Sequence, residues 1–501
     1  MILVWLITIL FVGGIGAWLS EKSNPQLPRV IALATILLDL FLVVLMFVAP
    51  GALGLDSAAS VVDLGQPGEW LVLSSNEWIP RFGISFIFGA DGLGMLLIML
   101  TVFLGLMSLG SAWHEIKDQP GFFYFNLLWT LAGVIGVFTA LDLFLFFFFW
   151  EVMLIPMYFI IAIWGHENKE YAAMKFFIFT QVSGMLMLLA ILVLVFFHYQ
   201  DTDILTFSYF DLLGTNIPSE YGFWLMLGFF LAFATKLPAV PVHNWLPDAH
   251  SQAPTPGSVI LAGILLKTGA YGLIRFTIPL FPDASATFAP TAMLMGVISI
   301  LYTAKVAFGQ NDLKRLIAYT SVSHMGFVLL GVYAWTAQSV QGAVMTMLAH
   351  GFSAAALFML AGGLQHRIHT RQMDQMGGLW GAAPKMAFMA LFFTVAAVGM
   401  PGLGNFIGEF LVLLGTFRIS IAAAALAAIG MVVAAVYSLI VIQKVFHGEN
   451  KNNLVVEDLT TIEMICLGLM MIGLLWMGLY PQSMLDMSEP TLRSLGVLFF
   501  D

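Results

Sequence analysis

The sequence predicts an all-α polytopic membrane protein of about fourteen transmembrane helices, and three observations indicate this fold class. Hydrophobic residues make up 60% of the 501 residues and charged residues only 10%, against about 45–50% and about 25% in soluble domains. Apolar runs long enough to cross about 30 Å of hydrocarbon recur along the chain. Lysine and arginine gather in alternate loops, as they do on the cytoplasmic side of membrane proteins.

Fourteen apolar runs are expected to be the spans. They lie near residues 2–20, 29–49, 91–112, 121–140, 141–164, 171–197, 221–242, 254–279, 287–309, 316–335, 338–365, 384–418, 419–446 and 461–480. The first is interpreted as a span rather than a secretory signal, because residues 1–19 have no basic segment and no small-residue cleavage site. Residues 50–90 alternate loosely and carry Gly and Pro, which predicts an extended or hairpin-like excursion outside the membrane.

Charge and cysteine content exclude several functions. A net charge of −10 has the wrong sign for a nucleic-acid surface. The single cysteine, Cys466, rules out an internal disulfide and a four-cysteine iron–sulfur site. The histidines have no zinc or haem spacing, and no Gly-rich phosphate loop follows a predicted strand. We therefore expect no metal, nucleotide or flavin site in this chain.

The distribution of positive charge predicts the orientation. Alternate loops, beginning after the first span, hold twelve of the nineteen basic residues, and the opposite loops hold four. The basic loops are expected in the cytoplasm, so both termini should face the periplasm. Arg275 is expected to mark the periplasmic membrane edge, and Lys305, Lys314 and Arg315 are interpreted as a cytoplasmic-end cluster.

Glu151 is an acid that stands alone in a long apolar run. No other charge occurs from 143 to 165, and a charge at mid-membrane costs at least about 2.5–3.5 kcal/mol on insertion scales. An acid this deep is typical of ion or proton movement, although a protonated glutamate that joins two helices is the structural alternative.

The seventh span carries a lysine and two prolines. Lys236 is followed by Pro238 and Pro241, which should break the helix because proline has no N–H to donate. Broken helices near the midplane are typical of transporters. A lysine that snorkels to the membrane surface is the alternative interpretation. Lys267, on the next span, is expected to lie inside the membrane among Gly and Ala residues.

The twelfth span is the second predicted broken helix. Glu409 follows Pro401 and Gly404, and no other charge occurs from 386 to 417. A neutral structural glutamate is again the alternative. His324 and His350, on spans ten and eleven, are candidate relay groups or hydrogen-bonded core residues, and His243 is either a relay or a loop residue.

The two broken spans predict an inverted repeat. They are five spans apart, and because five is odd the equivalent helices run in opposite directions. Spans four to eight and nine to thirteen would form the two halves. In this interpretation His324 matches Glu151 and Glu409 matches Lys236, with Lys267 between them. The predicted units are residues 1–120, 121–280, 281–446 and 447–501.

Four segments carry a family resemblance. They are WEVMLIPMYFIIAIWG, TKLPAVPVHNWLPDAHSQAPTPGSVILAGILLKTGAYG, SHMGFVLLG and PGLGNFIGEFLVLLG. They resemble the antiporter-like subunits of respiratory complex I, most closely the subunit M family of NADH-quinone oxidoreductase, which includes mitochondrial NADH dehydrogenase subunit 4. The acid at Glu409, where the L, N and antiporter classes are expected to carry lysine, favours M. So does the short tail, which leaves no room for the long lateral helix of subunit L.

The resemblance implies a proton-translocating membrane-arm subunit in the bacterial inner membrane. It implies that Glu151 and Lys236 form a coupling pair, that Lys267 and the histidines form a hydrated axis, and that Glu409 is the terminal proton site. Flavin, iron–sulfur clusters and quinone would belong to partner subunits, with L-type and N-type subunits and lipid as neighbours. The alternative is a subunit of a multisubunit sodium/proton antiporter or membrane-bound hydrogenase.

Overall fold

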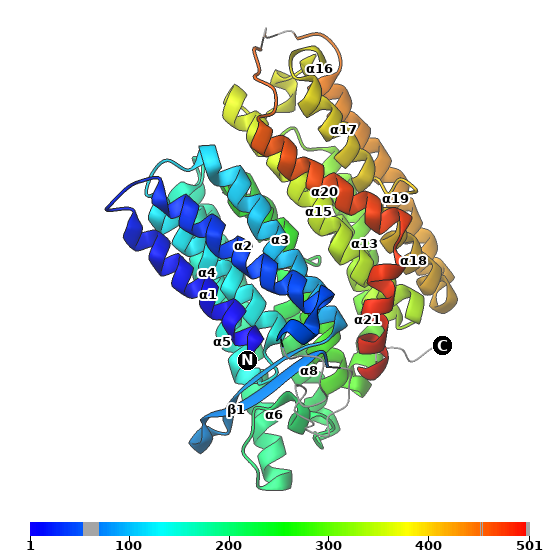
Figure 1. Cartoon of the computed structure of the whole chain (residues 1–501). Helices are drawn as coiled ribbons and strands as arrows, with labels where there is room; N and C mark the ends of the chain where they lie inside the picture. The colour runs from blue at the N-terminus through cyan, green and yellow to red at the C-terminus, as the bar shows by residue number, and fades with distance from the viewer. Residues whose placement is uncertain (54–69, 451, 453, 497–501) are drawn as a thin grey trace.

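The computed structural model describes residues 1–53, 70–450, 452 and 454–496. Long helices dominate it and run roughly side by side (Figure 1). The helices of the first third of the chain lie on one side of the view, and the last helices lie on the other.

Residues 1–202 supply six long helices and one hairpin. The helices are α1 (Ile2–Ser20), α2 (Leu27–Val48), α3 (Gly92–Glu115), α4 (Pro120–Thr139), α5 (Leu143–Trp164) and α6 (Lys169–Thr202). The short turns η1 (Pro50–Leu53) and η2 (Pro80–Phe82) flank the first strand.

An antiparallel hairpin lies where an extended excursion is expected. Strand β1 (Val72–Ile79) pairs with β2 (Ile84–Ala90), with Ser75 opposite Ile87. The rest of the predicted excursion, residues 54–69, lies outside the described residues. Gly83 closes the turn at φ +66°, and a Cβ there would lie 1.9 Å from the carbonyl oxygen of Leu205, so only glycine fits this approach.

The middle of the chain contains the first helix interruption. The helix α8 (Ser219–Lys236) ends at the lysine, and α9 (Trp245–Gln252) begins after a turn that contains Pro238 and Pro241. The short helix α7 (Tyr209–Leu212) precedes them. The next span is one nearly continuous helix built from α10 (Thr255–Ile260), η3 (Leu261–Leu265), α11 (Leu266–Gly272), η4 (Leu273–Thr277) and α12 (Ile278–Leu280), in which η3 and η4 are π-helical.

The last part of the chain contains the second interruption, between α17 (Pro384–Ala397) and α18 (Gly404–Ile419). Gly404 is the first residue of α18 rather than part of the gap, which Pro401 occupies. The other elements are α13 (Pro282–Phe308), α14 (Leu313–Ala334), α15 (Ala337–Ile368), η5 (Met373–Gln375), α16 (Leu379–Ala382), α19 (Ile421–Val441), η6 (Ile442–Phe446), α20 (Thr461–Leu479) and α21 (Gln482–Ser494).

Burial separates a central group of helices from a peripheral one. Among the described residues, twelve helices are long and apolar enough to cross a membrane, and the two other predicted spans coincide with the interrupted pairs α8–α9 and α17–α18. The most apolar stretch of the α10–α12 helix is wholly buried, whereas that of α20 is 28% buried and that of α1 33%. The α10–α12 helix is therefore the centre of the molecule, and α1 and α20 keep apolar faces for lipid or partner subunits.

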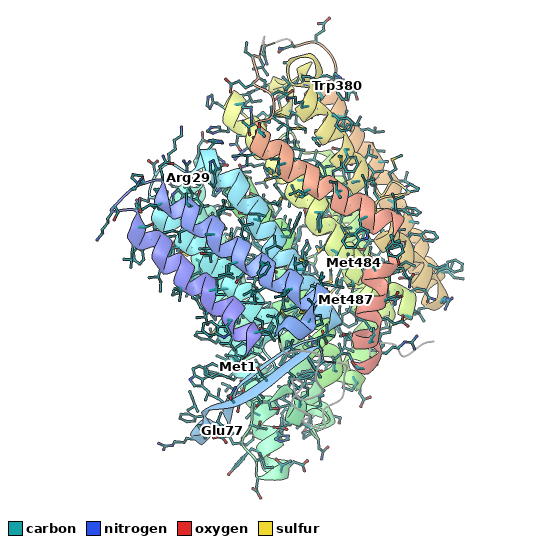
Figure 2. All side chains as sticks on the ribbon, in the orientation of Figure 1. Met1, Arg29, Glu77, Trp380, Met484 and Met487 are labelled. Atoms are coloured by element: carbon teal, nitrogen blue, oxygen red, sulfur yellow. The ribbon has the colours of Figure 1, made fainter. Side chains whose placement is uncertain are left out.

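The two ends of the helix bundle differ in charge. The loops and helix starts that carry Lys22, Lys117, Lys169, Arg371 and Lys385 lie at one end, here named the basic end. Figure 2 places Arg29 and Trp380 near this end and Met1 and Glu77 at the opposite end. The start of the chain, the hairpin and α21 thus share the end that is poor in positive charge.

Candidate functional site

Glu151 and Lys236 approach one another around the ring of Trp150. Lys236, at the end of α8, is 1% exposed, and its Nζ lies 5.2 Å from the Trp150 ring centre and 5.5 Å from that of Phe176. Within the described residues, this amine has no hydrogen-bond partner and no carboxylate within 4.0 Å. The two aromatic faces supply its nearest attractive contacts.

The Glu151 carboxyl lies on α5 and faces α6. Its Oε1 lies 3.1 Å from where a Cβ on Gly184 would stand, and Gln181 of the same helix lies within hydrogen-bond reach of the carboxyl. Any larger residue at 184 would press on the acid. The glycine therefore leaves room for Glu151 between the two helices.

The turn after Lys236 is held by side chains. The prolines remove N–H donors, and the carbonyl of Thr235 is instead satisfied by the indole N–H of Trp245 at 2.9 Å. The N–H of Val240 donates to the hydroxyl of Ser299 at 2.9 Å. The interruption is thus a fixed feature of the fold, and it places Lys236 at the end of its helix.

Lys267, His350, His324 and Glu409 form a contiguous buried chain. The Nζ of Lys267 lies 2.8 Å from Nδ1 of His350 and donates to the carbonyl of Ala262 at 2.6 Å. The rings of His350 and His324 lie 5.6 Å apart, centre to centre. The Nδ1 of His324 lies 2.6 Å from Oε1 of Glu409. All four side chains are at most 4% exposed.

Four different helices supply this chain of groups. Lys267 comes from α11, His324 from α14, His350 from α15 and Glu409 from α18. The π-helical turns η3 and η4 stand on either side of the lysine, and such turns are frequent at functional sites. We name these four residues the relay cluster.

The Glu151–Lys236 pair and the relay cluster are neighbours. A Cβ on Gly269, two residues after Lys267, would lie 2.5 Å from the carbonyl oxygen of Phe233 and 2.7 Å from the N of Leu237. The α11 backbone therefore touches α8 on both sides of Lys236 in the chain. No hydrogen bond of the described residues joins the two lysines.

His243 is buried in the first interruption but apart from the relay cluster. It is 3% exposed and sits edge-on to Tyr302, with ring centres 5.8 Å apart. No hydrogen bond within the described parts of the chain links it to Lys236 or Lys267.

Comparison with known proteins shows which family this chain resembles. Residues 140–447 match the model of the family described as NADH:quinone oxidoreductase/Mrp antiporter, TM. NADH-quinone oxidoreductase subunit M of Pseudomonas aeruginosa is 51% identical over 502 residues, covering 99% of this chain and 97% of the relative. Subunit M of Escherichia coli strain K12 is 50% identical over 507 residues, covering 100% and 98%.

The chain belongs to the NADH-quinone oxidoreductase subunit M family.

Solved structures agree with this assignment. A chain of respiratory complex I from Thermus thermophilus with bound NADH is 31% identical and superposes with a TM-score of 0.88, over 99% of both chains. A chain of the Mrp complex from Dietzia shares the fold at 20% identity, with a TM-score of 0.81 over 99% of this chain and 52% of that one. Subunit M and that antiporter chain therefore share one architecture.

Two buried cations lie where the sequence predicted end positions. Lys314 is fully buried, unlike exposed Lys305, and its amine lies 3.3 Å from Nε2 of His166 and 3.3 Å from the carbonyl oxygen of Ala253. Arg275 is 1% exposed, and its guanidinium pairs with Asp91.

His250 is a buried histidine that the sequence reasoning did not single out in this subunit M chain. It is fully buried in α9, its ring is stacked on Phe358 at 4.2 Å, and neither ring nitrogen has a partner in the described part of the chain. The signal was present, because His250 closes the same HNWLPDAH segment that contains His243.

Proposed function

We propose that this chain translocates protons as a membrane-arm subunit of NADH:quinone oxidoreductase, and that the relay cluster is its path through the membrane interior. The observation that supports this is the series of four neighbouring buried titratable groups from Lys267 to Glu409, drawn from four helices. Titratable groups are rare inside a membrane unless they serve ions or protons.

The relatives supply the context. Those that are about half identical are named subunits of NADH-quinone oxidoreductase, and the Thermus thermophilus neighbour comes from respiratory complex I with bound NADH. In this proposal the chain works beside L-type and N-type subunits. Flavin, iron–sulfur clusters and quinone are held by other subunits, and this chain carries out no redox chemistry.

The orientation follows from charge. The basic end faces the cytoplasm of a bacterial inner membrane, and both termini face the periplasm, because positive loops are retained inside. The Glu151–Lys236 pair then receives the driving signal from a neighbouring subunit. When Glu151 is ionised, it favours the protonated lysine, and when the pairing weakens the lysine can release its proton.

The proton then passes along the relay cluster to Glu409 and leaves on the periplasmic side. Lys267 and His350 are already in hydrogen-bond contact, as are His324 and Glu409. The step between the two histidine rings, and the step between the lysines, each require a bridging water or a small side-chain movement. The energy for the cycle comes from differential interactions in two states of the pair.

The test uses the assembled complex in inverted membrane vesicles. Lys236→Met removes the titratable group and keeps most of its volume, and Lys305→Met is the matched control, because Lys305 is an exposed lysine on α13. We expect Lys236→Met to lower the number of protons pumped per NADH oxidised and Lys305→Met to leave it unchanged. Normal pumping by an assembled Lys236→Met complex would refute the proposal.

A sodium/proton antiporter subunit is the second candidate, because the family model and the Dietzia chain include Mrp antiporters. It predicts sodium-dependent proton exchange in vesicles without NADH or quinone. The identity of about 50% to named subunit M chains favours the first function.

A further inference from the structure

A polar cavity of about 540 Å³ opens at the basic end of the molecule. Its lining comes from α3, the α5–α6 loop, α10 and the end of α15, and it includes Glu115, His166, His366, His369 and Arg371. A cavity of this size holds many waters, because one water needs only about 10–15 Å³ of such space. The aqueous phase therefore reaches His166.

His166 lines this cavity, and the fully buried Lys314 lies against it. The Nζ of Lys314 lies 3.3 Å from Nε2 of His166. Burial, together with the positive charges of Lys314 and Arg371, lowers the pKa of His166 to about 4. The imidazole is thus neutral at neutral pH, so Nε2 can accept a hydrogen bond from the lysine. Glu115 and Asp312 are the acids whose charges act on Lys314.

His250 lies on α9, which packs against α14, and Lys314 reaches the carbonyl of Ala253 at the end of α9, three residues after His250. The ring of His250 is stacked on Phe358 of α15, the helix that carries His350. Both ring nitrogens of His250 are buried and have no partner among the described residues. This imidazole therefore lies on the helix that Lys314 contacts and against the helix that carries His350.

We infer that His166, Lys314 and His250 form a proton-uptake branch that feeds the relay cluster at Lys267 and His350 directly from the basic end, without passing through the Glu151–Lys236 pair. The inference rests on the proposed function and assigns the pair a different task. The pair controls when the relay cluster can accept a proton, and the branch supplies that proton.

The transfer balances in protons and charge. Lys314 releases one proton to a ring nitrogen of His250, which passes one on to the relay cluster. The neutral amine of Lys314 is then recharged by a proton taken from cavity water through the imidazole of His166. One proton leaves the aqueous phase and one enters the relay cluster, while all three side chains return to their starting states.

A purely structural role for Lys314 is the competing explanation. Its amine also donates to the carbonyl of Ala253 at 3.3 Å, so it could simply fasten the start of α14 to the end of α9. Arginine at this position keeps a permanent positive charge and several donors but cannot release a proton at these pH values. Lys314→Arg would therefore rescue a structural role and would not rescue a proton-transfer role.

The experiment measures protons pumped per NADH oxidised, together with the NADH oxidation rate, in vesicles that contain the assembled complex. The variants are Lys314→Met, Lys314→Arg and His166→Gln, with exposed Lys305→Met as the matched control. We expect both Lys314 variants to lose the share of protons that this chain pumps, His166→Gln to slow pumping, and the control to match the unaltered complex. Normal pumping by Lys314→Arg together with loss in Lys314→Met would assign Lys314 a structural role and overturn the branch.

The failure of this inference can be told apart from failure of the proposed function. If Lys236→Met stops pumping while Lys314→Met and His166→Gln pump normally, uptake occurs elsewhere and only the branch is wrong. If Lys236→Met pumps normally as well, the proposed function itself fails. If Lys314→Met does not assemble, Lys314→Arg and His166→Gln still decide the question, because normal pumping by both rejects the branch.

Discussion

His324 is the only contact of the described residues that joins Glu409 to the rest of the relay cluster, so its removal tests the path most directly. Proton transfer needs donor and acceptor about 2.6–3.2 Å apart, directly or through one water. The present geometry gives 2.6 Å from His324 to Glu409, but 5.6 Å between the centres of the two histidine rings.

Two substitutions of His324 distinguish removal of the titratable ring from exclusion of water at its site. In His324→Leu the apolar side chain fills the site and excludes water, and transfer through it should slow by about a hundredfold or more. In His324→Ala the freed volume exceeds the roughly 10–15 Å³ that one water needs, so water can replace the ring and part of the flux should remain. Both changes leave the buried Glu409 carboxyl without its partner, which costs about 1–3 kcal/mol of stability.

The assay is NADH-driven acidification of inverted vesicles, normalised to the NADH oxidation rate and to the amount of assembled complex. His447→Leu is the control, because His447 is exposed at the basic end. We expect pumping in the order control, His324→Ala, His324→Leu. A His324→Leu complex that pumps like the control would refute the path through this residue.

Two further predictions concern stability. Arg275→Met leaves Asp91 as an uncompensated buried charge, so we expect the folded state to lose about 3–5 kcal/mol of stability, seen as a lower melting temperature of the complex. The double change Arg275→Met with Asp91→Asn should recover much of that stability. Equal losses in the single and the double variant would show that the ion pair is not the cause. His166 has a folded-state pKa of about 4, below its unfolded value of about 6.5, so the unfolded chain binds more protons between these values and stability should fall as pH drops from about 6.5 to about 4. His166→Gln should flatten that part of a melting-temperature profile, and an unchanged slope would contradict the assignment.

The sequence predicted which charges are interior but not which charges meet. Lys236, Lys267 and Glu409 stand out because each interrupts an apolar run, and the structure buries all three. The contact between His324 and Glu409 joins residues 85 positions apart, and no periodicity of a single helix contains that information. The high free-energy cost of a charge inside the membrane identifies the unusual residues in the sequence, whereas tertiary packing determines which of them come into contact.

The sequence did not reveal the partners of two buried cations. Arg275 pairs with Asp91, which lies 184 positions away in the chain. Lys314 begins a helix beside Arg315, yet α14 turns that lysine inward and leaves Arg315 half-buried in an ion pair with Asp248. A helix start near a loop is not necessarily a solvent-facing position.

The proposed matching of Lys236 with Glu409 is not supported by the helix bounds. Lys236 is the last residue of α8, before its interruption, whereas Glu409 lies five residues beyond the start of α18, after the second interruption. Equivalent positions of two repeats would lie on the same side of their gaps. The inverted repeat as a whole stays a prediction from span order.

Glu151 differs from Glu409 in its exposure, because it lies on a face of α5 that is partly exposed. Phe148 and Ile155, three residues before it and four after it, are 44% and 50% exposed, and Glu151 itself is only partly buried. The α5 stripe that bears this carboxyl thus forms part of the outer flank of the subunit. Bare acyl chains are a poor neighbour for such a group, so the flank is suited to a polar surface of an adjoining subunit. A change of charge on the adjoining subunit's surface would then act on the Glu151 carboxyl electrostatically, without any displacement of the main chain.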